Sequence, residues 1–454
     1  MEKRFVPIFM VFFSLLYLSS AYFPSSLADT LISAVSGALI VLLFWQMRGW
    51  ILWMYLALVL AGTALLAASG ASAEAYAQAL RFHAGIATLF VVIPLLALPI
   101  QQGKFERAMK EVLTAYGKNA TAYSLLTMLM NFVIAIFVNM GAYILVHSLT
   151  GRSGGRWRIV QGKSLLRGFV CSILVSPYFV AMGMITLYFH VSWIEVTSVT
   201  CWIVLVMFLL HYVEMRWKFG KMEEPVEERA PARDGVETVS RGAKIKLFQL
   251  GVSMLVFTAV LLLIESNTAY PMVTLVCTAS LFAPIIGFML LKQTGALIPA
   301  LKEQYLYGKL PMIGKEVALM LCAGFFSDAF RESGLTDRML AWLPDGGGPS
   351  GWLVLAAMTA VLYLFSVVGF HPIIVVTVIL SVFSRADLGF PAGVVPAIIL
   401  SVWALSLGLS PFSGSGLLLA GLMKTSSFTI SVVWNWKYTL LATLLMFAVA
   451  YILY

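Results

Sequence analysis

The sequence is poor in charge and contains no recognisable catalytic motif. Only 11% of its 454 residues are charged, whereas a soluble domain carries about a quarter. It has no phosphate-binding loop, no nucleophile motif, and no His, Asp or Glu cluster with metal-ligand spacing. The four cysteines lie in apolar runs, which favours small core residues over disulfides or a metal site. These absences argue against an enzyme, including an intramembrane transferase.

Apolar residues, by contrast, make up 61% of the chain and fall in long runs. A helix needs roughly 20 apolar residues to cross the hydrocarbon of a bilayer. The sequence therefore predicts an all-α polytopic membrane protein of the cell membrane, with the lipid bilayer as its solvent. The candidate spans are 5–23, 27–47, 50–69, 83–101, 121–150, 165–188, 192–215, 247–265, 270–291, 315–330, 352–383, 389–423 and 428–454.

The formal charge of +9 reflects Lys and Arg residues in short loops between spans. Such a distribution is typical of the positive charge that gathers on the cytoplasmic side of membrane proteins, so we expect no nucleic-acid partner. It predicts a cytoplasmic N-terminus, a cytoplasmic linker at 216–246 and an outside C-terminus. Lys163 and Arg167 are assigned to the cytoplasmic side by the same rule.

Two of the apolar runs, 121–150 and 352–383, are interrupted near their centres. Asn139 and Gly141 interrupt the first, and Gly369, His371 and Pro372 interrupt the second. If either run crossed the membrane completely, clusters of basic residues would lie on both sides. The charge bias therefore predicts that each run is a re-entrant hairpin.

The order of elements is the same in the two halves of the chain. After an extra N-terminal helix at 1–26, the segments 27–215 and 247–454 each contain five crossing spans, one of them a long span with a central Ser-Pro, and in addition one hairpin. These long spans are 165–188 and 389–423. Because the number of crossings is odd, the sequence predicts two inverted repeats joined by the 216–246 linker.

Broken helices at the middle of a membrane are characteristic of secondary transporters. Each break frees backbone N–H and C=O groups, which cost several kcal/mol each unless something binds them. We therefore expect the breaks to line a binding site for substrate and coupling ion. The candidate residues are Asn139, Gly141, Ser176, Pro177, Gly369, His371, Pro372, Ser410, Pro411, Ser413, Gly414 and Ser415. A kinked helix that packs through small residues is the alternative for 410–416.

This order of elements resembles the ion transporter superfamily and, within it, the divalent anion/sodium symporter family. The resemblance covers nearly the whole chain as a pattern. In that family each hairpin tip carries Ser-Asn-Thr, of which this chain keeps only Asn139. The resemblance implies that the two tips and the segments around Ser176 and Ser410 enclose the substrate and a coupling ion, and that the protein is a homodimer.

Two ionisable residues have two interpretations each. His371 either carries a coupling proton or binds an anion, or it is a neutral histidine that hydrogen-bonds a hairpin carbonyl. Asp328 either forms a proton relay with His371 or pairs with Arg331 at the outer boundary.

The sequence thus favours an ion-coupled transporter of a small organic anion that works by elevator-like alternating access. Sodium and a proton both remain candidates for the coupling ion, and no other cofactor is expected. The alternatives are a transporter or flippase of a larger or lipid-linked envelope solute, and an intramembrane transferase.

Overall fold

A computed structural model describes residues 2–103, 105–149, 155–222, 239–341, 349–370 and 372–453. Within these ranges the ordered elements are all helices. The described residues contain twelve segments that are long and apolar enough to cross a membrane, some of them made of more than one helix, or thirteen if the bent pair Thr294–Met312 and Gly314–Glu332 forms one span. The prediction of an all-α polytopic membrane protein is confirmed.

The helices before the linker take up the first 219 residues. In chain order they are α1 (Glu2–Tyr22), α2 (Ser26–Phe44), α3 (Trp50–Ala68), α4 (Ala73–Arg81), α5 (Ala84–Val92), α6 (Pro94–Gln102), α7 (Glu106–Tyr116), α8 (Ala120–Val138), α9 (Gly141–Leu149), α10 (Gly155–Val175), α11 (Val180–Phe189) and α12 (Trp193–Phe219).

The helices after the linker follow a similar order, with a π-helix in place of α4. They are α13 (Arg241–Asn267), α14 (Met272–Leu290), η2 (Thr294–Ala296), α15 (Leu297–Pro299), η3 (Ala300–Lys309), η4 (Leu310–Met312), α16 (Gly314–Glu332), α17 (Leu335–Leu340), α18 (Pro349–Val368), α19 (Pro372–Phe383), α20 (Val394–Leu409), α21 (Gly414–Met423), η5 (Thr429–Val433) and α22 (Trp436–Leu453).

Polar caps start several of these helices. Asn119 accepts a hydrogen bond from the Ala122 amide at 2.8 Å and so begins α8. Ser192 and Glu195 form a complete capping box that begins α12. Ser240 caps α13 and also donates a hydrogen bond to Glu111 of α7, at 2.6 Å. The span predicted at 83–101 is not one straight helix, because α5 ends at Val92 and α6 begins at Pro94, which has no N–H to donate to the preceding turn.

Helices α8 and α10 lie side by side and run in the same direction. Near their starts, the rings of Tyr123 and Trp157 are 5.2 Å apart. Near their ends, the Ser176 hydroxyl donates to the Ile136 carbonyl at 2.8 Å. The chain between α8 and α10 must therefore return to the end where α8 begins, and α9 makes this return. Together α8 and α9 form a helical hairpin.

The same geometry holds for α18 and α20. Trp352 near the start of α18 packs on Phe390, just before α20, with 4.8 Å between ring centroids. The Ser410 hydroxyl, just after α20, donates to the Ser366 carbonyl near the end of α18 at 2.7 Å. The intervening chain, which contains α19, therefore also folds back along α18.

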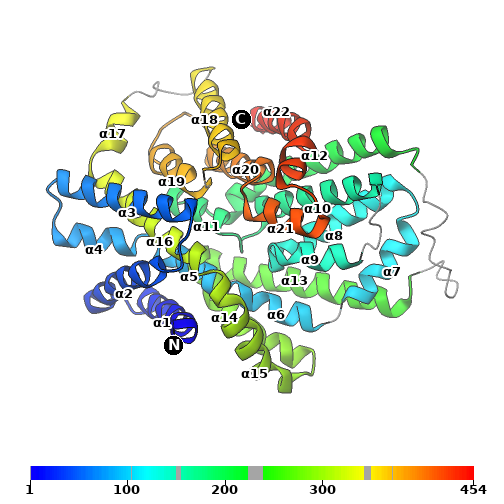
Figure 1. Cartoon of the computed structure of the whole chain (residues 1–454), viewed down its shortest axis with the longest axis horizontal. Coiled ribbons are helices and arrows are strands. Elements are labelled where there is room, and N and C mark those ends of the chain that lie inside the picture. The colour runs from blue at the N-terminus through cyan, green and yellow to red at the C-terminus, as the bar shows by residue number, and fades with distance from the viewer. Residues whose placement is uncertain are drawn as a thin grey trace.

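The two broken spans, α10 with α11 and α20 with α21, cross each other at the core of the molecule (Figure 1). Helix α10 contacts both α20 and α21, and α11 contacts α20. Val170 of α10 packs closely on Gly408 of α20. A β-carbon added to Gly408 would lie 3.0 Å from a methyl carbon of Val170. Since the second part of each span lies against the first part of the other, the two spans run antiparallel.

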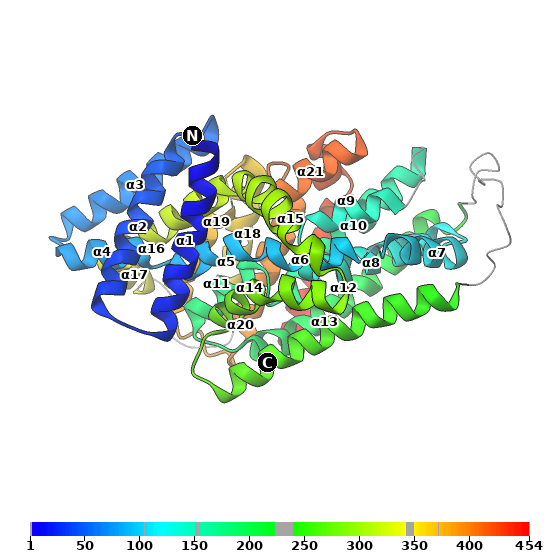
Figure 2. The same cartoon turned by 90° about the horizontal axis from the view of Figure 1, so that it is seen from below.

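Helices α3 and α4 lie at one end of the long axis of the molecule and α7 lies at the other (Figures 1 and 2). The linker predicted at 216–246 is partly helical, because α12 extends to Phe219 and α13 begins at Arg241. The rest of that linker, 223–238, lies outside the described residues. The division of the chain into two repeats stays a prediction.

Candidate functional site

The tip of the first hairpin is formed by Asn139 and Met140. Asn139 follows the end of α8 with a φ of +55° and a ψ of −138°, a backbone conformation that residues with a side chain rarely adopt. Its side-chain oxygen accepts a hydrogen bond from the Met140 amide at 2.7 Å. Gly141 then begins α9, and a β-carbon at Gly141 would stand 2.8 Å from the side chain of Val138. The tip therefore depends on the two residue types that interrupt the apolar run in the sequence.

The first broken span is interrupted at Ser176 and Pro177, both of which are buried. The Ser176 hydroxyl accepts a hydrogen bond from the Tyr178 amide at 3.2 Å, in addition to its donation to Ile136. Pro177 has no N–H to continue the helix. The serine thus satisfies one backbone group of the break and one of the hairpin that packs against it.

The second broken span repeats this arrangement. The Ser410 hydroxyl accepts from the Phe412 amide at 3.3 Å and donates to the Ser366 carbonyl. Ser366 precedes Gly369 by three residues, just as Ile136 precedes Asn139 by three. Each serine therefore links the break in its span to the residue three positions before a hairpin tip.

The two hairpin tips meet at the second break. Gly369, with a φ of +111°, faces the ring of Phe412, and a β-carbon there would stand 3.2 Å from the ring. Gly414 lies against Met140, and a β-carbon added to Gly414 would lie 3.7 Å from the sulfur of Met140. Helices α9 and α21 also contact each other. The N-termini of α9 and α21 consequently lie close together.

Several serine hydroxyls surround the first turn of α21. Ser413 caps this helix through the Gly416 amide at 3.1 Å and contacts Ser415 at 3.2 Å. Ser427 donates to the carbonyl of Pro411 at 2.6 Å. A β-carbon at Gly416 would stand within 3.0 Å of the hydroxyls of three serines, Ser413, Ser427 and Ser431. The second break is therefore more polar than the first.

The remaining predicted residues lie apart from this meeting point or outside the described residues. His371 is outside the described residues, and Pro372 begins α19 and is buried. Asp328 is buried and forms an ion pair with Arg331. Its neighbour Ser327 contacts Ser381 at 2.7 Å, about 13 Å along α19 from Pro372. The proton relay between Asp328 and His371 stays a prediction, because His371 lies outside the described residues.

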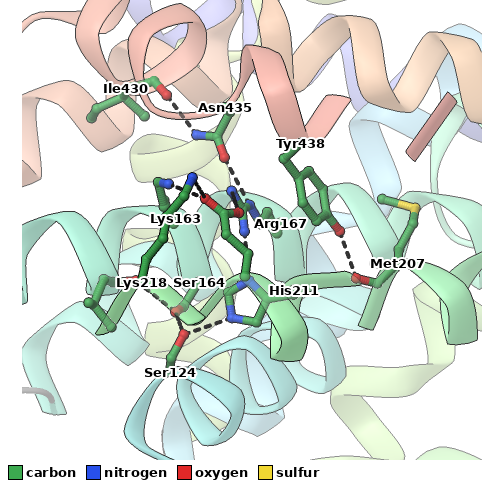
Figure 3. Close-up of polar contacts among 12 residues, drawn as sticks. Ser124, Lys163, Ser164, Arg167, Met207, His211, Lys218, Ile430, Asn435 and Tyr438 are labelled. Carbon is green, nitrogen blue, oxygen red and sulfur yellow. Dashed lines mark hydrogen bonds and ion pairs between the residues drawn. The ribbon is translucent and has the colours of Figure 1, made fainter. Parts of the chain in front are cut away.

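The structure also contains a buried charged cluster that the sequence did not predict (Figure 3). Arg167, at the middle of α10, is 2% exposed. Its Nη2 atom lies 2.7 Å from Glu214 Oε2 of α12, as an ion pair without hydrogen-bond geometry. Its Nε atom donates to Oδ1 of Asn435, just before α22, at 2.9 Å, and its guanidinium stacks 3.8 Å from the ring centre of Tyr438 of α22.

The protonation of His211 follows from its partners in this cluster. His211 Nδ1 lies 3.0 Å from Arg167 Nη1, and arginine can only donate, so Nδ1 accepts. The Nε2 atom, 2.7 Å from the Ser124 hydroxyl, therefore carries the proton and donates it. The Ser124 hydroxyl in turn contacts Ser164 at 2.7 Å. His211 is a neutral imidazole in this arrangement.

The cluster carries a surplus of positive charge. Lys163 and Lys218 also contact Glu214, at 2.6 and 2.9 Å, so three cations face one carboxylate. Lys163 is 6% exposed. A small cavity lies between Arg167 and Gly408, two residues before Ser410. The surplus of positive charge therefore lies on the α10 side of the second break.

A pattern in the sequence could have indicated this cluster. Lys163 and Arg167 are four residues apart, as are Glu214 and Lys218, so each pair lies on one face of its helix. The positive-inside rule assigned both basic residues of the first pair to the membrane surface, but α10 begins eight residues before Lys163 and buries both. The rule counts charges and carries no information on which helix face is buried.

A second buried polar chain joins α11 to α16 and α19. His83 Nε2 lies 2.9 Å from the Tyr188 hydroxyl, which contacts Ser327 at 2.6 Å. His83 Nδ1 lies 3.2 Å from the Met320 carbonyl, which can only accept, so this nitrogen carries the proton. Through Ser327 and Ser381 the chain reaches the second arm of the second hairpin.

No protein-family model and no curated protein matches the sequence. The fold, however, is similar to that of solved transporters. The YdaH transporter of Alcanivorax borkumensis aligns over 88% of this chain and 96% of its own, with a TM-score of 0.56 and 16% identity. Neisseria gonorrhoeae MtrF, described as illuminating a class of antimetabolite efflux pumps, aligns over 87% of this chain and 94% of its own, with a TM-score of 0.57 and 12% identity. At these identities the comparisons show the fold.

Proposed function

We propose that the protein is an ion-coupled secondary transporter that carries a small organic anion across the membrane by alternating access. Its fold is similar to that of transporters. The observation that carries the proposal is the matched pair of breaks, in which Ser176 and Ser410 make equivalent hydrogen bonds to two hairpins. We further propose that the two halves are inverted repeats of the ion transporter superfamily type, and that the protein is a homodimer.

The preference for an anion follows from the groups that surround the second break. The helices α9 and α21 begin near each other, and helix N-termini carry partial positive charge and free N–H groups. The buried hydroxyls of Tyr143 and Ser431, which accept or donate no hydrogen bond among the described residues, supply further donors. The surplus charge around Arg167 adds a positive field on the α10 side of this site.

Alternating access would use the two hairpins as the moving parts. Each hairpin tip contacts a break through few side chains, such as Met140 against Gly414 and Phe412 against Gly369. Since hairpins of inverted repeats enter from opposite sides, one would open the site to each side in turn. Sodium would be held by freed carbonyls and hydroxyls at the breaks, whereas a proton would be carried by a side chain such as His371.

Uptake into liposomes tests this proposal. We expect saturable uptake of at least one of succinate, citrate and benzoate by the purified protein under an imposed sodium or proton gradient. Uptake that follows the proton gradient and is lost in His371→Ala would assign the coupling proton to His371. Flux that does not saturate at any concentration would indicate a channel and would contradict the proposal.

Efflux is a second candidate direction, because MtrF belongs to a class of efflux pumps. Cells that express an exporter accumulate less of the labelled anion than control cells, whereas cells that express an importer accumulate more.

A further inference from the structure

A basic groove opens beside the last turns of α12. It has a volume of about 840 Å³ and is lined by Arg156 at the start of α10 and by residues of α12 and the segment after it. Four of its lining residues are basic and none is acidic. The lining residues are Arg156, Tyr212, Val213, Arg216, Trp217, Lys218, Gly220, Lys221 and Met222.

Three of the four cations have no recorded carboxylate partner among the described residues. Lys218 pairs with Glu214 at 2.9 Å, but no ion pair is found for Arg156, Arg216 or Lys221 within the described ranges. All three side chains are exposed. The groove therefore presents uncompensated positive charge to whatever enters it.

The groove continues into an apolar stripe along α12. Trp202, Leu205, Leu209 and Val213 recur every three or four residues, so they share one face of the helix, and each is about half exposed. The stripe extends over about 16 Å, which is roughly half the thickness of the hydrocarbon core. Helix α12 is long and apolar enough to cross a membrane, which would place this face against lipid tails.

Two aromatic residues mark the boundary between the stripe and the groove. Trp217 is 82% exposed and Tyr212 is 43% exposed. Exposed Trp and Tyr side chains are enriched at the level of lipid headgroups, where one part of the ring is apolar and another is polar. Positive charge above this level and apolar side chains below it match the two parts of a phospholipid.

We propose that this groove binds the headgroup of an anionic phospholipid, whose acyl chain lies along the apolar stripe of α12. Basic pockets at the ends of transmembrane helices recognise anionic headgroups through several cations at once. The phosphate would contact Arg156 and Arg216, which come from different helices, so the lipid would also join the start of α10 to the end of α12. A soluble anion would use the cations but would gain nothing from the stripe.

Brominated lipids test this proposal, because bromine quenches a nearby tryptophan and Trp217 lines the groove. The signal of Trp217 is the difference between the wild-type protein and Trp217→Phe, both reconstituted in the same vesicles. We expect brominated phosphatidylglycerol to quench this signal at least threefold more than brominated phosphatidylcholine at equal mole fraction. The triple variant Arg156→Gln, Arg216→Gln, Lys221→Gln should lose the preference, and Lys218 is kept because it pairs with Glu214.

A matched control removes the same number of charges elsewhere. Lys302→Gln, Lys309→Gln, Lys315→Gln changes three exposed lysines near the π-helix η3 and should keep the preference. Equal quenching by the two lipids would overturn the proposal, as would weak quenching by both, which is the outcome if a second copy of the chain covers this face. Loss of the preference in 10 mM inorganic phosphate would also overturn it, since the groove would then bind a soluble anion.

Discussion

Replacing Arg167 with alanine is expected to lower the free energy of unfolding by about 3–5 kcal/mol, the usual cost of removing one partner from a buried ion pair. The change leaves Glu214 buried with one cation fewer, and it leaves Asn435 Oδ1 and His211 Nδ1 without the donor that each now has. It also opens a cavity under the ring of Tyr438. We expect the thermal midpoint of the purified protein to fall clearly, with loss of anion uptake.

Two further variants separate charge from packing. Arg107→Ala removes an arginine that is 93% exposed and should change the unfolding free energy by less than about 0.5 kcal/mol. In the double variant Arg167→Ala, Glu214→Gln, the buried Lys163 also loses its carboxylate partner, so stability should fall below that of Arg167→Ala alone. If Arg167→Ala is as stable as Arg107→Ala, the cluster does not contribute to the stability of the fold and our account of it is wrong.

Replacing Gly369 with alanine is expected to disrupt the contact between the second hairpin and the second break. At a φ of +111° a side chain strains the backbone, which costs about 1–3 kcal/mol. The new methyl group would also stand 3.2 Å from the ring of Phe412, which must then move. We expect initial uptake rates to fall roughly tenfold or more, since about 1.4 kcal/mol at a functional contact corresponds to a factor of ten.

Gly70→Ala is the matched control for this prediction. Gly70 also has a positive φ, +66°, but a β-carbon there meets nothing within 4 Å. The double variant Gly369→Ala, Phe412→Ala removes the ring and should recover the part of the loss that comes from the clash. Uptake that is unchanged in Gly369→Ala would show that this tip does not need to approach the break.

The fold class and the break positions could be predicted from the sequence for a simple physical reason. Long apolar runs permit few structures in lipid, and residues such as Pro177 and Pro411 cannot continue a helix. Asn139 and Gly369, at the places where the structure turns, were visible because they interrupt apolar runs. At these positions the residue type alone was sufficient to predict where the helices break.

The buried cluster depends on contacts between distant segments, which the sequence pattern does not reveal. Arg167 contacts Asn435, which is 268 residues away in the sequence, and only the tertiary fold brings the two side chains together. The chain from His83 through Tyr188 to Ser327 is of the same kind. A single polar residue in an apolar run carries no information about its partners.

The central claim is that the two hairpins enter the membrane from opposite sides. It is tested by labelling single cysteines with a membrane-impermeant maleimide in sealed vesicles of known orientation. The background needs only Cys201→Ser, because the other three cysteines are buried. Cysteines at Lys118 and Arg156 flank the first hairpin, and cysteines at Ala341 and Asp387 flank the second. All four positions are exposed.

We predict that the cysteines at positions 118 and 156 react from one side of the membrane and those at positions 341 and 387 from the other. Reaction of Lys118→Cys and Arg156→Cys from different sides, or of all four from the same side, would contradict the account.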